Sequence, residues 1–181
     1  MIEKKGFEGA VLACIVVVER SFALLSIIAY CYNESMVFFF GLGNPGAPYQ
    51  NTRHNAGQFV LRDLLRLVGD IQLSALKKAE ASVAKTPTAI FAESLLFMNE
   101  SGKSIRSVIE YFDKDFQAGD SLDAVYVIHD DLDLELGQYK IQFGTGPKIH
   151  NGLLSTYQYL KTMNFWHVRV GVDTRNGDRS L

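Results

Sequence analysis

Residues 41–57 read GLGNPGAPYQNTRHNAG, directly after the apolar run Val37–Phe40 and before a stretch in which apolar residues have helical spacing. The run therefore leaves a predicted buried strand, at the place where α/β proteins hold their ligands. Its polar side chains, among them Asn44, Arg53 and His54, are too numerous for a core segment. The sequence predicts a functional loop at the end of the first strand of an α/β domain.

The same loop formally matches a dinucleotide-binding motif through Gly41, Gly43 and Gly46. In that motif the third glycine opens a helix whose amino end faces a pyrophosphate. Here the helical pattern begins only near Asn55, and the nearest acidic residue, Asp63, falls within the helix instead of at a second strand end. The sequence therefore does not favour a nucleotide cofactor.

Strand-like and helix-like segments alternate along the rest of the chain. The predicted strands are Val37–Phe40, Ser82–Lys85, Ala89–Phe91, Ala124–Ile128, Gln138–Phe143 and Val168–Val172, and the predicted helices are Asn55–Val68, Ser101–Phe112 and Leu153–Leu160. This alternation predicts a three-layer α/β domain, with a central sheet flanked by helices.

Length and composition are consistent with one globular domain, since the chain has 181 residues and is 48% hydrophobic. A net charge of −2 gives no general attraction to nucleic acid, so such binding would need a local basic patch. The two cysteines, Cys14 and Cys31, form no disulfide framework or zinc spacing and favour a reducing compartment.

Residues 1–35 contain two apolar runs, Ala10–Val18 and Ser21–Tyr32, separated by the charged pair Glu19-Arg20. Neither run reaches the ~18 residues expected of a membrane-spanning helix. A targeting sequence and a simple upstream extension both remain open, because basic residues precede the apolar runs but no cleavage site stands out. We expect an apolar extension over 1–35 and the domain itself over 36–181.

Four polar clusters lie outside the predicted core: Asn44–Asn55, Phe97–Asn99, His129–Asp133 and His150–Gly152. A histidine with a carboxylate partner is the minimal general-base pair, and asparagine amides can orient a carbonyl or a water. Because no serine or cysteine has the context of an activated nucleophile, we expect water to be the attacking group.

Two other interpretations of these clusters remain open. Asp130, Asp131 and Asp133 with a neighbouring histidine could bind a hard divalent metal in a metal-dependent hydrolase, which a chelator would inactivate. The same carboxylates could also form a solvated turn in a catalytically impaired protein that binds tRNA without cleaving it.

The clusters together resemble the bacterial-type peptidyl-tRNA hydrolase family, over residues 36–173. The matching blocks are Gly41–Gly46, Tyr49, Thr52–Gly57, Phe97–Lys103, His129–Leu134, His150–Leu153 and Arg169–Gly171. The resemblance implies hydrolysis of the ester between a peptide and tRNA, and a mixed, twisted sheet flanked by helices. It also implies tRNA as the partner and no metal or organic cofactor. We expect a monomer without an obligatory protein partner, in the cytoplasm or alternatively in the mitochondrion.

The resemblance further implies roles for single residues. His54 matches the general base that activates water, Asp130 the carboxylate that orients it, and Asn44 the amide that helps to distinguish blocked from free aminoacyl groups. Other positions match residues that line the substrate site or contact the tRNA acceptor stem: Tyr49, Phe97, Asn99, Asn151, Lys140 and Arg169. Lys103 and Arg106 are additional basic candidates.

The sequence departs from the family pattern at three places. Lys148 and Ile149 stand where glycines are expected before His150, and Gln142 stands where a second basic residue is common. The chain also ends nine residues after Val172, so we expect a domain truncated at its C-terminus.

Overall fold

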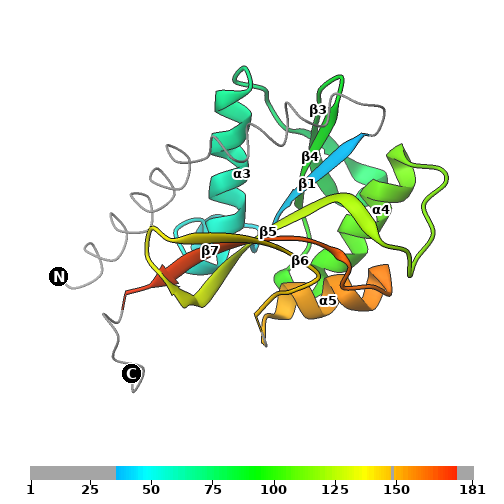
Figure 1. Cartoon of the computed structure of the whole chain (residues 1–181). Helices are drawn as coiled ribbons and strands as arrows, with labels where there is room; N and C mark the ends of the chain where they lie inside the picture. Colours follow the sequence, from blue (N-terminus) through cyan, green and yellow to red (C-terminus); the bar gives the residue numbers. More distant parts are fainter. Residues whose placement is uncertain (1–35, 148, 175–181) are drawn as a thin grey trace.

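A computed structural model describes residues 36–147 and 149–174, and the predicted extension over 1–35 lies outside these residues. The described part is built on one seven-stranded sheet with the strand order β2-β3-β4-β1-β5-β7-β6 (Figure 1). Strands β4, β1, β5 and β7 are mutually parallel, whereas the pairs β2–β3, β3–β4 and β6–β7 are antiparallel. The predicted mixed sheet is confirmed.

The elements have the following bounds. The strands are β1 (Val37–Gly41), β2 (Ser74–Leu76), β3 (Ala81–Lys85), β4 (Ala89–Ser94), β5 (Leu122–Glu135), β6 (Tyr139–Phe143) and β7 (Phe165–Asp173). The helices are α3 (Ala56–Leu67), α4 (Ser101–Phe112) and α5 (Asn151–Leu160), with short 3-10 turns η1 (Ala47–Tyr49), η2 (Arg53–Asn55), η3 (Lys77–Ala79) and η4 (Met98–Glu100). None of the described helices is both long and apolar enough to cross a membrane.

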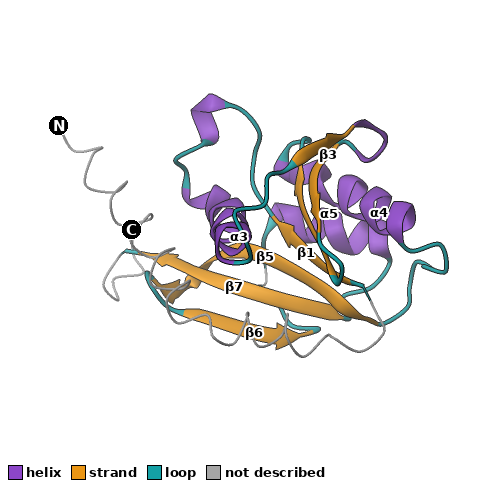
Figure 2. Ribbon diagram, turned by 90° about the horizontal axis from the view of Figure 1, so that it is seen from above, coloured by secondary structure: helices purple, strands orange, loops and turns teal. Residues whose placement is uncertain are grey.

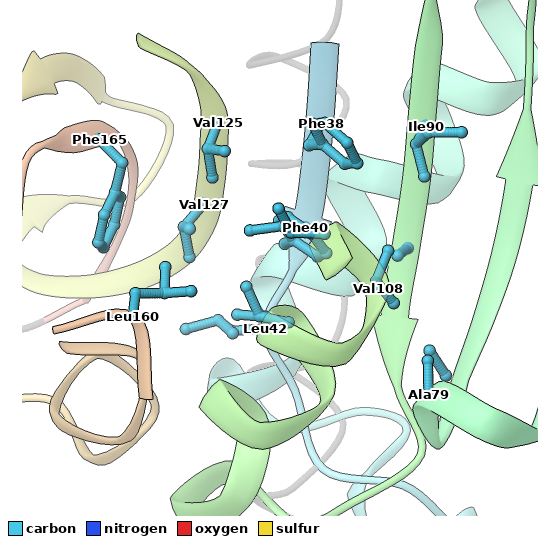
Figure 3. Close-up of a cluster of buried hydrophobic side chains, with 14 of the residues drawn as sticks. Phe38, Phe40, Leu42, Ala79, Ile90, Val108, Val125, Val127, Leu160 and Phe165 are labelled. Atoms are coloured by element: carbon cyan, nitrogen blue, oxygen red, sulfur yellow. The ribbon is translucent and has the colours of Figure 1, made fainter. Parts of the chain in front are cut away.

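The helices cover the two faces of the sheet, with α3 on one side and the α4–α5 pair on the other (Figure 2). This arrangement follows from the alternation of side chains along β1. Phe39 packs with Leu61 of α3 in one core cluster, whereas Phe38 and Phe40 pack with Val108 of α4 in the other (Figure 3). The predicted three layers are confirmed.

Two glycines bring the helices close enough to build a site. A Cβ on Gly57, in the first turn of α3, would lie 2.2 Å from the Ile128 carbonyl oxygen of β5. A Cβ on Gly102 of α4 would lie 2.2 Å from the Ser155 carbonyl oxygen of α5. Since any larger residue would clash with backbone, these contacts set the start of α3 against β5 and hold α5 against α4.

Four strands differ clearly from the prediction. β4 continues to Ser94, three residues beyond the predicted end at Phe91. β2 was not predicted, because it has only three residues and lies mostly exposed at the sheet edge. β5 extends to Glu135, seven residues beyond the predicted end at Ile128, because the acidic stretch pairs with β7 through a register shift between Asp131 and Glu135. β7 begins at Phe165, before the predicted Val168.

Candidate active site

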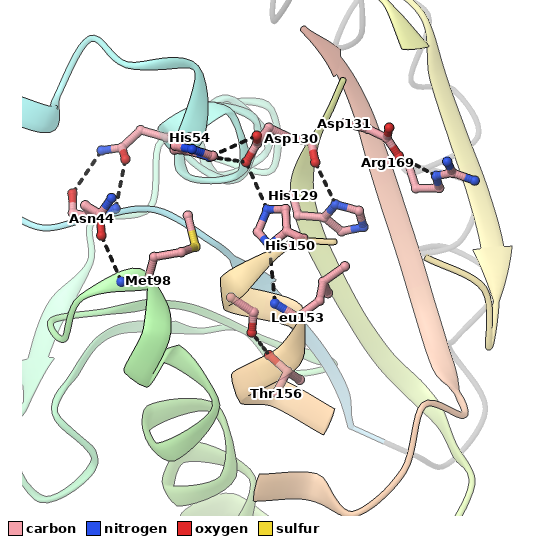
Figure 4. Close-up of polar contacts among 12 residues, drawn as sticks. Asn44, His54, Met98, His129, Asp130, Asp131, His150, Leu153, Thr156 and Arg169 are labelled. Carbon is pink, nitrogen blue, oxygen red and sulfur yellow. Dashed lines mark hydrogen bonds and ion pairs between the residues drawn. The ribbon is translucent and has the colours of Figure 1, made fainter. Parts of the chain in front are cut away.

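The polar clusters meet where β1 ends, beside the part of β5 that carries Asp130 (Figure 4). His54 lies in η2, just before α3, and Asp130 lies in β5. His150 is the residue that precedes α5. Segments from three parts of the chain therefore meet around one carboxylate.

Asp130 accepts hydrogen bonds from two histidines. Its Oδ1 and Oδ2 lie 3.2 and 3.0 Å from Nδ1 of His54, and Oδ1 lies 3.0 Å from Nε2 of His150. The carboxylate side chain is only 4% exposed, whereas that of His54 is 61% exposed. Because the carboxylate accepts the proton on Nδ1, neutral His54 has its lone pair on Nε2, the nitrogen required of a general base.

The same contacts set the protonation of the pair. Burial would raise the pKa of Asp130, but the hydrogen bonds from His150 and His54 outweigh it and hold that pKa well below the usual value. The bond to Asp130 raises the pKa of His54, against the lowering effect of partial burial. Asp130 is therefore an anion at neutral pH, and it strengthens His54 as a base.

The tautomer of His150 decides whether this group can hold a metal. His54, Asp130 and His150 offer one ligand atom each within 4.8 Å of one another. However, Nδ1 of His150 accepts the backbone N–H of Leu153 at 3.3 Å, so Nε2 carries the proton that points to Asp130. A metal would need the lone pair at that protonated nitrogen. The arrangement therefore fits a hydrogen-bond relay and not a metal centre.

Asn44 is fixed by contacts at both its backbone and its side chain. Its Oδ1 accepts the backbone N–H of Met98 at 2.8 Å, and its backbone N–H and carbonyl bond the side-chain amide of Asn55 at 2.8 and 3.0 Å. Oδ1 is thus assigned as the acceptor, which leaves the Nδ2 amide as a donor with no partner among residues 36–147 and 149–174. The sequence signalled Asn44 but not the roles of Met98 and Asn55.

The remaining predicted substrate residues lie next to these groups in the chain, and none of them is among the residues that line the cleft beside the histidines. The rings of Tyr49 and Phe97 meet edge to face with centroids 6.0 Å apart, and both are exposed. Asn99 in η4 and Asn151 at the start of α5 are also exposed. The cleft has a volume of about 310 Å³ and includes the apolar side chains Leu132, Pro147 and Ile149.

The two predicted basic residues differ in their environment, although Lys140 of β6 and Arg169 of β7 are register partners. Lys140 is exposed. Arg169 is only 12% exposed at its side chain and donates from Nε to Asp131 Oδ2 and from an Nη to Gln142 Oε1, both at 2.6 Å. The structure therefore brings Arg169 into an ion pair, whereas Lys140 is exposed and has no ion pair within residues 36–147 and 149–174.

Known proteins share the sequence pattern and the fold of this chain. The model of the family "Peptidyl-tRNA hydrolase" matches residues 38–181. The chain is 40% identical over 140 residues to the peptidyl-tRNA hydrolase of Corynebacterium efficiens, covering 77% of this chain and 75% of the relative. It is 38% identical over 136 residues to that of Lawsonia intracellularis, covering 73% and 64% of the two chains. The crystal structure of peptidyl-tRNA hydrolase from Acinetobacter baumannii superposes with a TM-score of 0.65 at 27% identity, covering 76% of this chain and 68% of that one.

Proposed function

The chain belongs to the peptidyl-tRNA hydrolase family, and from this premise we propose that it hydrolyses the ester joining a peptide, or an N-blocked aminoacyl group, to tRNA. The observation that carries the proposal is the position of Asp130, buried between His54 and His150 at the edge of a cleft. A buried anion that orients a solvent-exposed imidazole is the arrangement that general-base hydrolysis needs.

In the proposed reaction, Nε2 of His54 removes a proton from water while the water oxygen attacks the ester carbonyl carbon. The carbonyl π bond opens to a tetrahedral oxyanion, and the proton held on His54 then passes to the departing ribose oxygen. The C–O ester bond breaks, giving a free carboxyl group and a tRNA hydroxyl. Asp130 stabilises the imidazolium throughout, because its carboxylate accepts the proton on Nδ1.

Asn44 is proposed to supply the polar contact to the acyl group. Since its Oδ1 is engaged by the Met98 N–H, the Nδ2 amide can donate to a substrate carbonyl or to the developing oxyanion. Tyr49 and Phe97 offer exposed aromatic faces to the terminal base or the peptide, an interaction worth ~1–3 kcal/mol per stacked base. Asn99 and Asn151 complete this proposed binding surface.

The proposed substrate also predicts the compartment in which the protein acts. Peptidyl-tRNA arises during translation, so we place the activity in the cytoplasm, with the mitochondrion as the alternative. The chain is proposed to act as a monomer, because a single copy already brings His54, Asp130 and His150 within 4.8 Å of one another.

The test is single-turnover hydrolysis of an N-acetylated aminoacyl-tRNA by the wild-type protein and by His54→Ala. We expect the variant to lose ester cleavage while it still binds tRNA, because the His54 side chain is 61% exposed and its proposed role is to accept a proton. Undiminished cleavage by the variant would refute the assigned base.

Two controls separate the alternatives. Wild-type activity should persist after treatment with a chelator, whereas a metal-dependent hydrolase using Asp130, Asp131 and Asp133 would lose it. Binding of tRNA by the wild type without any cleavage would instead indicate a catalytically impaired tRNA-binding protein.

A further inference from the structure

Three side chains with buried polar atoms lie behind the active site and take no part in the proposed reaction. His129 in β5, His167 in β7 and Tyr157 in α5 form a contiguous group. The ring of His167 lies 5.7 Å from that of His129 and 5.9 Å from that of Tyr157, centroid to centroid. Both histidines are fully buried. We call these three residues the inner polar cluster.

Each member of the inner polar cluster has a buried polar atom to satisfy. Nε2 of His129, both ring nitrogens of His167 and the hydroxyl of Tyr157 make no hydrogen bond of standard geometry among the described residues. The backbone of Met163 does come near enough to the His167 ring to oppose the lowering of its pKa by burial. Buried polar atoms are almost always hydrogen-bonded, to protein or to an ordered water. Finding several such atoms in one place therefore indicates a ligand.

The donors and acceptors in the cluster can be assigned. Nδ1 of His129 donates to the Asp130 backbone carbonyl at 2.9 Å, so Nε2 of this neutral ring must be an acceptor. Burial lowers the pKa of His129 to about 3 and that of His167 to about 4, so both rings are neutral at physiological pH. Burial also raises the pKa of Tyr157 to about 12, which keeps its hydroxyl a donor.

Gly146 shows that two of these atoms face a common point. A Cβ built on Gly146 would lie 2.8 Å from Nδ1 of His167 and 2.8 Å from the hydroxyl oxygen of Tyr157. The loop before His150 thus passes the cluster at a residue without a side chain. Nδ1 of His167 and the Tyr157 hydroxyl oxygen are therefore no more than twice this 2.8 Å distance apart, a span that one small polar molecule can bridge with two hydrogen bonds.

We propose that the inner polar cluster binds one buried water molecule, which ties α5 to the part of β5 that carries Asp130. Such a water donates its two protons to His129 Nε2 and to a ring nitrogen of His167, and it accepts the Tyr157 proton. Three hydrogen bonds are the usual number for a buried water. Neutral tyrosine is a poor metal ligand, and the cluster offers no carboxylate, so a metal ion is the less favoured occupant.

The position of the water links it to catalysis. Tyr157 lies on the helix that follows His150, and His129 is the residue before Asp130. A tie between them therefore helps to maintain the 3.0 Å contact of His150 with Asp130 (Figure 4). Tyr157 and His167 act as positioning residues in this proposal, and that catalytic consequence rests on the proposed function.

The water site is tested on the intact wild-type chain and on Tyr157→Phe, which removes only the hydroxyl. A high-resolution crystal structure of the wild type should show one water bonded to His129, His167 and Tyr157, and Tyr157→Phe should lose or displace it. No solvent peak in the wild type would overturn the proposal. So would a metal ion bonded to His129 and His167 in a crystal structure obtained after zinc exposure, because it would make the inner polar cluster a metal site. The crystal structure of the wild type alone decides whether the water is present, so the test does not depend on whether Tyr157→Phe folds.

The positioning role is tested by steady-state kinetics with the N-acetylated aminoacyl-tRNA. Tyr157→Phe should lower kcat by about threefold to tenfold with KM unchanged, which is less than the ~10²-fold that a 1 Å misplacement can cost. Tyr159→Phe, on the same helix but outside the cluster, is the matched control and should match the wild type. An unchanged kcat in Tyr157→Phe would reject the positioning role. A wild type with the water but no hydrolysis would reject the proposed function and leave the water site standing.

Discussion

Asp130 and Asp131 are neighbours in the chain, are both buried, and have opposite kinds of partner. Asp130 bonds two imidazoles, those of His54 and His150. Asp131 bonds the guanidinium of Arg169, and its Oδ1 also accepts the Asp133 backbone N–H at 2.8 Å. Adjacent residues of a strand point to opposite faces, so β5 separates the two carboxylates although they are consecutive.

The difference shows that the partner, and not the carboxylate, decides what each region can do. An imidazole gains and loses a proton near neutral pH, so the Asp130 region can move protons during hydrolysis. A guanidinium stays charged at every physiological pH. The Asp131 region can therefore only hold structure, and it fixes β5 to β7 beside the active site.

The largest expected effect comes from breaking the Asp130 region. Asp130→Asn should lower kcat by ~10²–10⁴-fold, the usual contribution of general acid–base catalysis, because the amide no longer stabilises the imidazolium of His54. The measurement is single-turnover hydrolysis with saturating enzyme. Asp120→Asn, an exposed turn residue, is the control and should cleave at the wild-type rate. If Asp131→Asn lost as much activity per folded molecule, the division between the two regions would be wrong.

Breaking the Asp131 region should instead cost stability. Asp131→Asn leaves the nearly buried guanidinium of Arg169 without its counter-ion, and losing one partner of a buried pair costs about 3–5 kcal/mol. The free energy of unfolding in urea measures this loss. Asp133→Asn is the matched control, because only its backbone N–H contacts Asp131. Equal unfolding midpoints for wild type and Asp131→Asn would mean that the ion pair contributes nothing.

Much of the fold was predictable because local patterns and packing agree. The predicted helix Ser101–Phe112 matches α4 at both ends, since its apolar residues lie on the face that packs in the core. The predicted strand Ser82–Lys85 is one residue short of β3. The end of β5 was not predictable from local pattern, because an acidic run resembles a turn until its pairing with β7 is known.

The site was predictable as a set of residues but not as a set of bonds. The motifs placed His54, Asp130 and Asn44 together, and the structure brings His54 and Asp130 into contact. The second imidazole on Asp130 was missed, because the orientation of His150 depends on the Leu153 N–H at the start of α5. The Arg169 ion pair was also missed, since it depends on the register of two strands distant in sequence. The role of Arg169 toward tRNA stays a prediction.

The face of the sheet that carries Asp131 also carries His129 of β5 and His167 of β7. Stability on this side of the sheet should therefore depend on pH. Burial holds their pKa values near 3 and 4, below the usual 6.5, so the unfolded chain binds more protons than the folded one. Their contribution to stability is therefore complete above pH 6.5 and is lost as the pH falls through the folded values, near 4 for His167 and near 3 for His129, at up to about 1.4 kcal/mol per pH unit for each histidine.

The free energy of unfolding in urea, measured at several pH values between 4 and 6.5, gives this loss of stability. His167→Phe keeps the ring stacked on Phe165, with 4.5 Å between the wild-type centroids, but removes one titrating group. The variant should depend less steeply on pH than the wild type. Equal slopes for the two proteins would show that His167 does not titrate with unfolding.

The smallest expected effect concerns the two cations beside these carboxylates. Lys140 is exposed and free to meet a phosphate, whereas Arg169 is already paired with Asp131. Each phosphate contact contributes about 0.7–0.9 to the slope of log affinity against log salt, through release of counterions. Lys140→Gln should reduce that slope for tRNA by one such contribution, and Arg169→Gln, measured on folded protein at low temperature, should leave it unchanged. A reduced slope in Arg169→Gln would mean that tRNA draws Arg169 away from Asp131, so that the structural region also serves in binding.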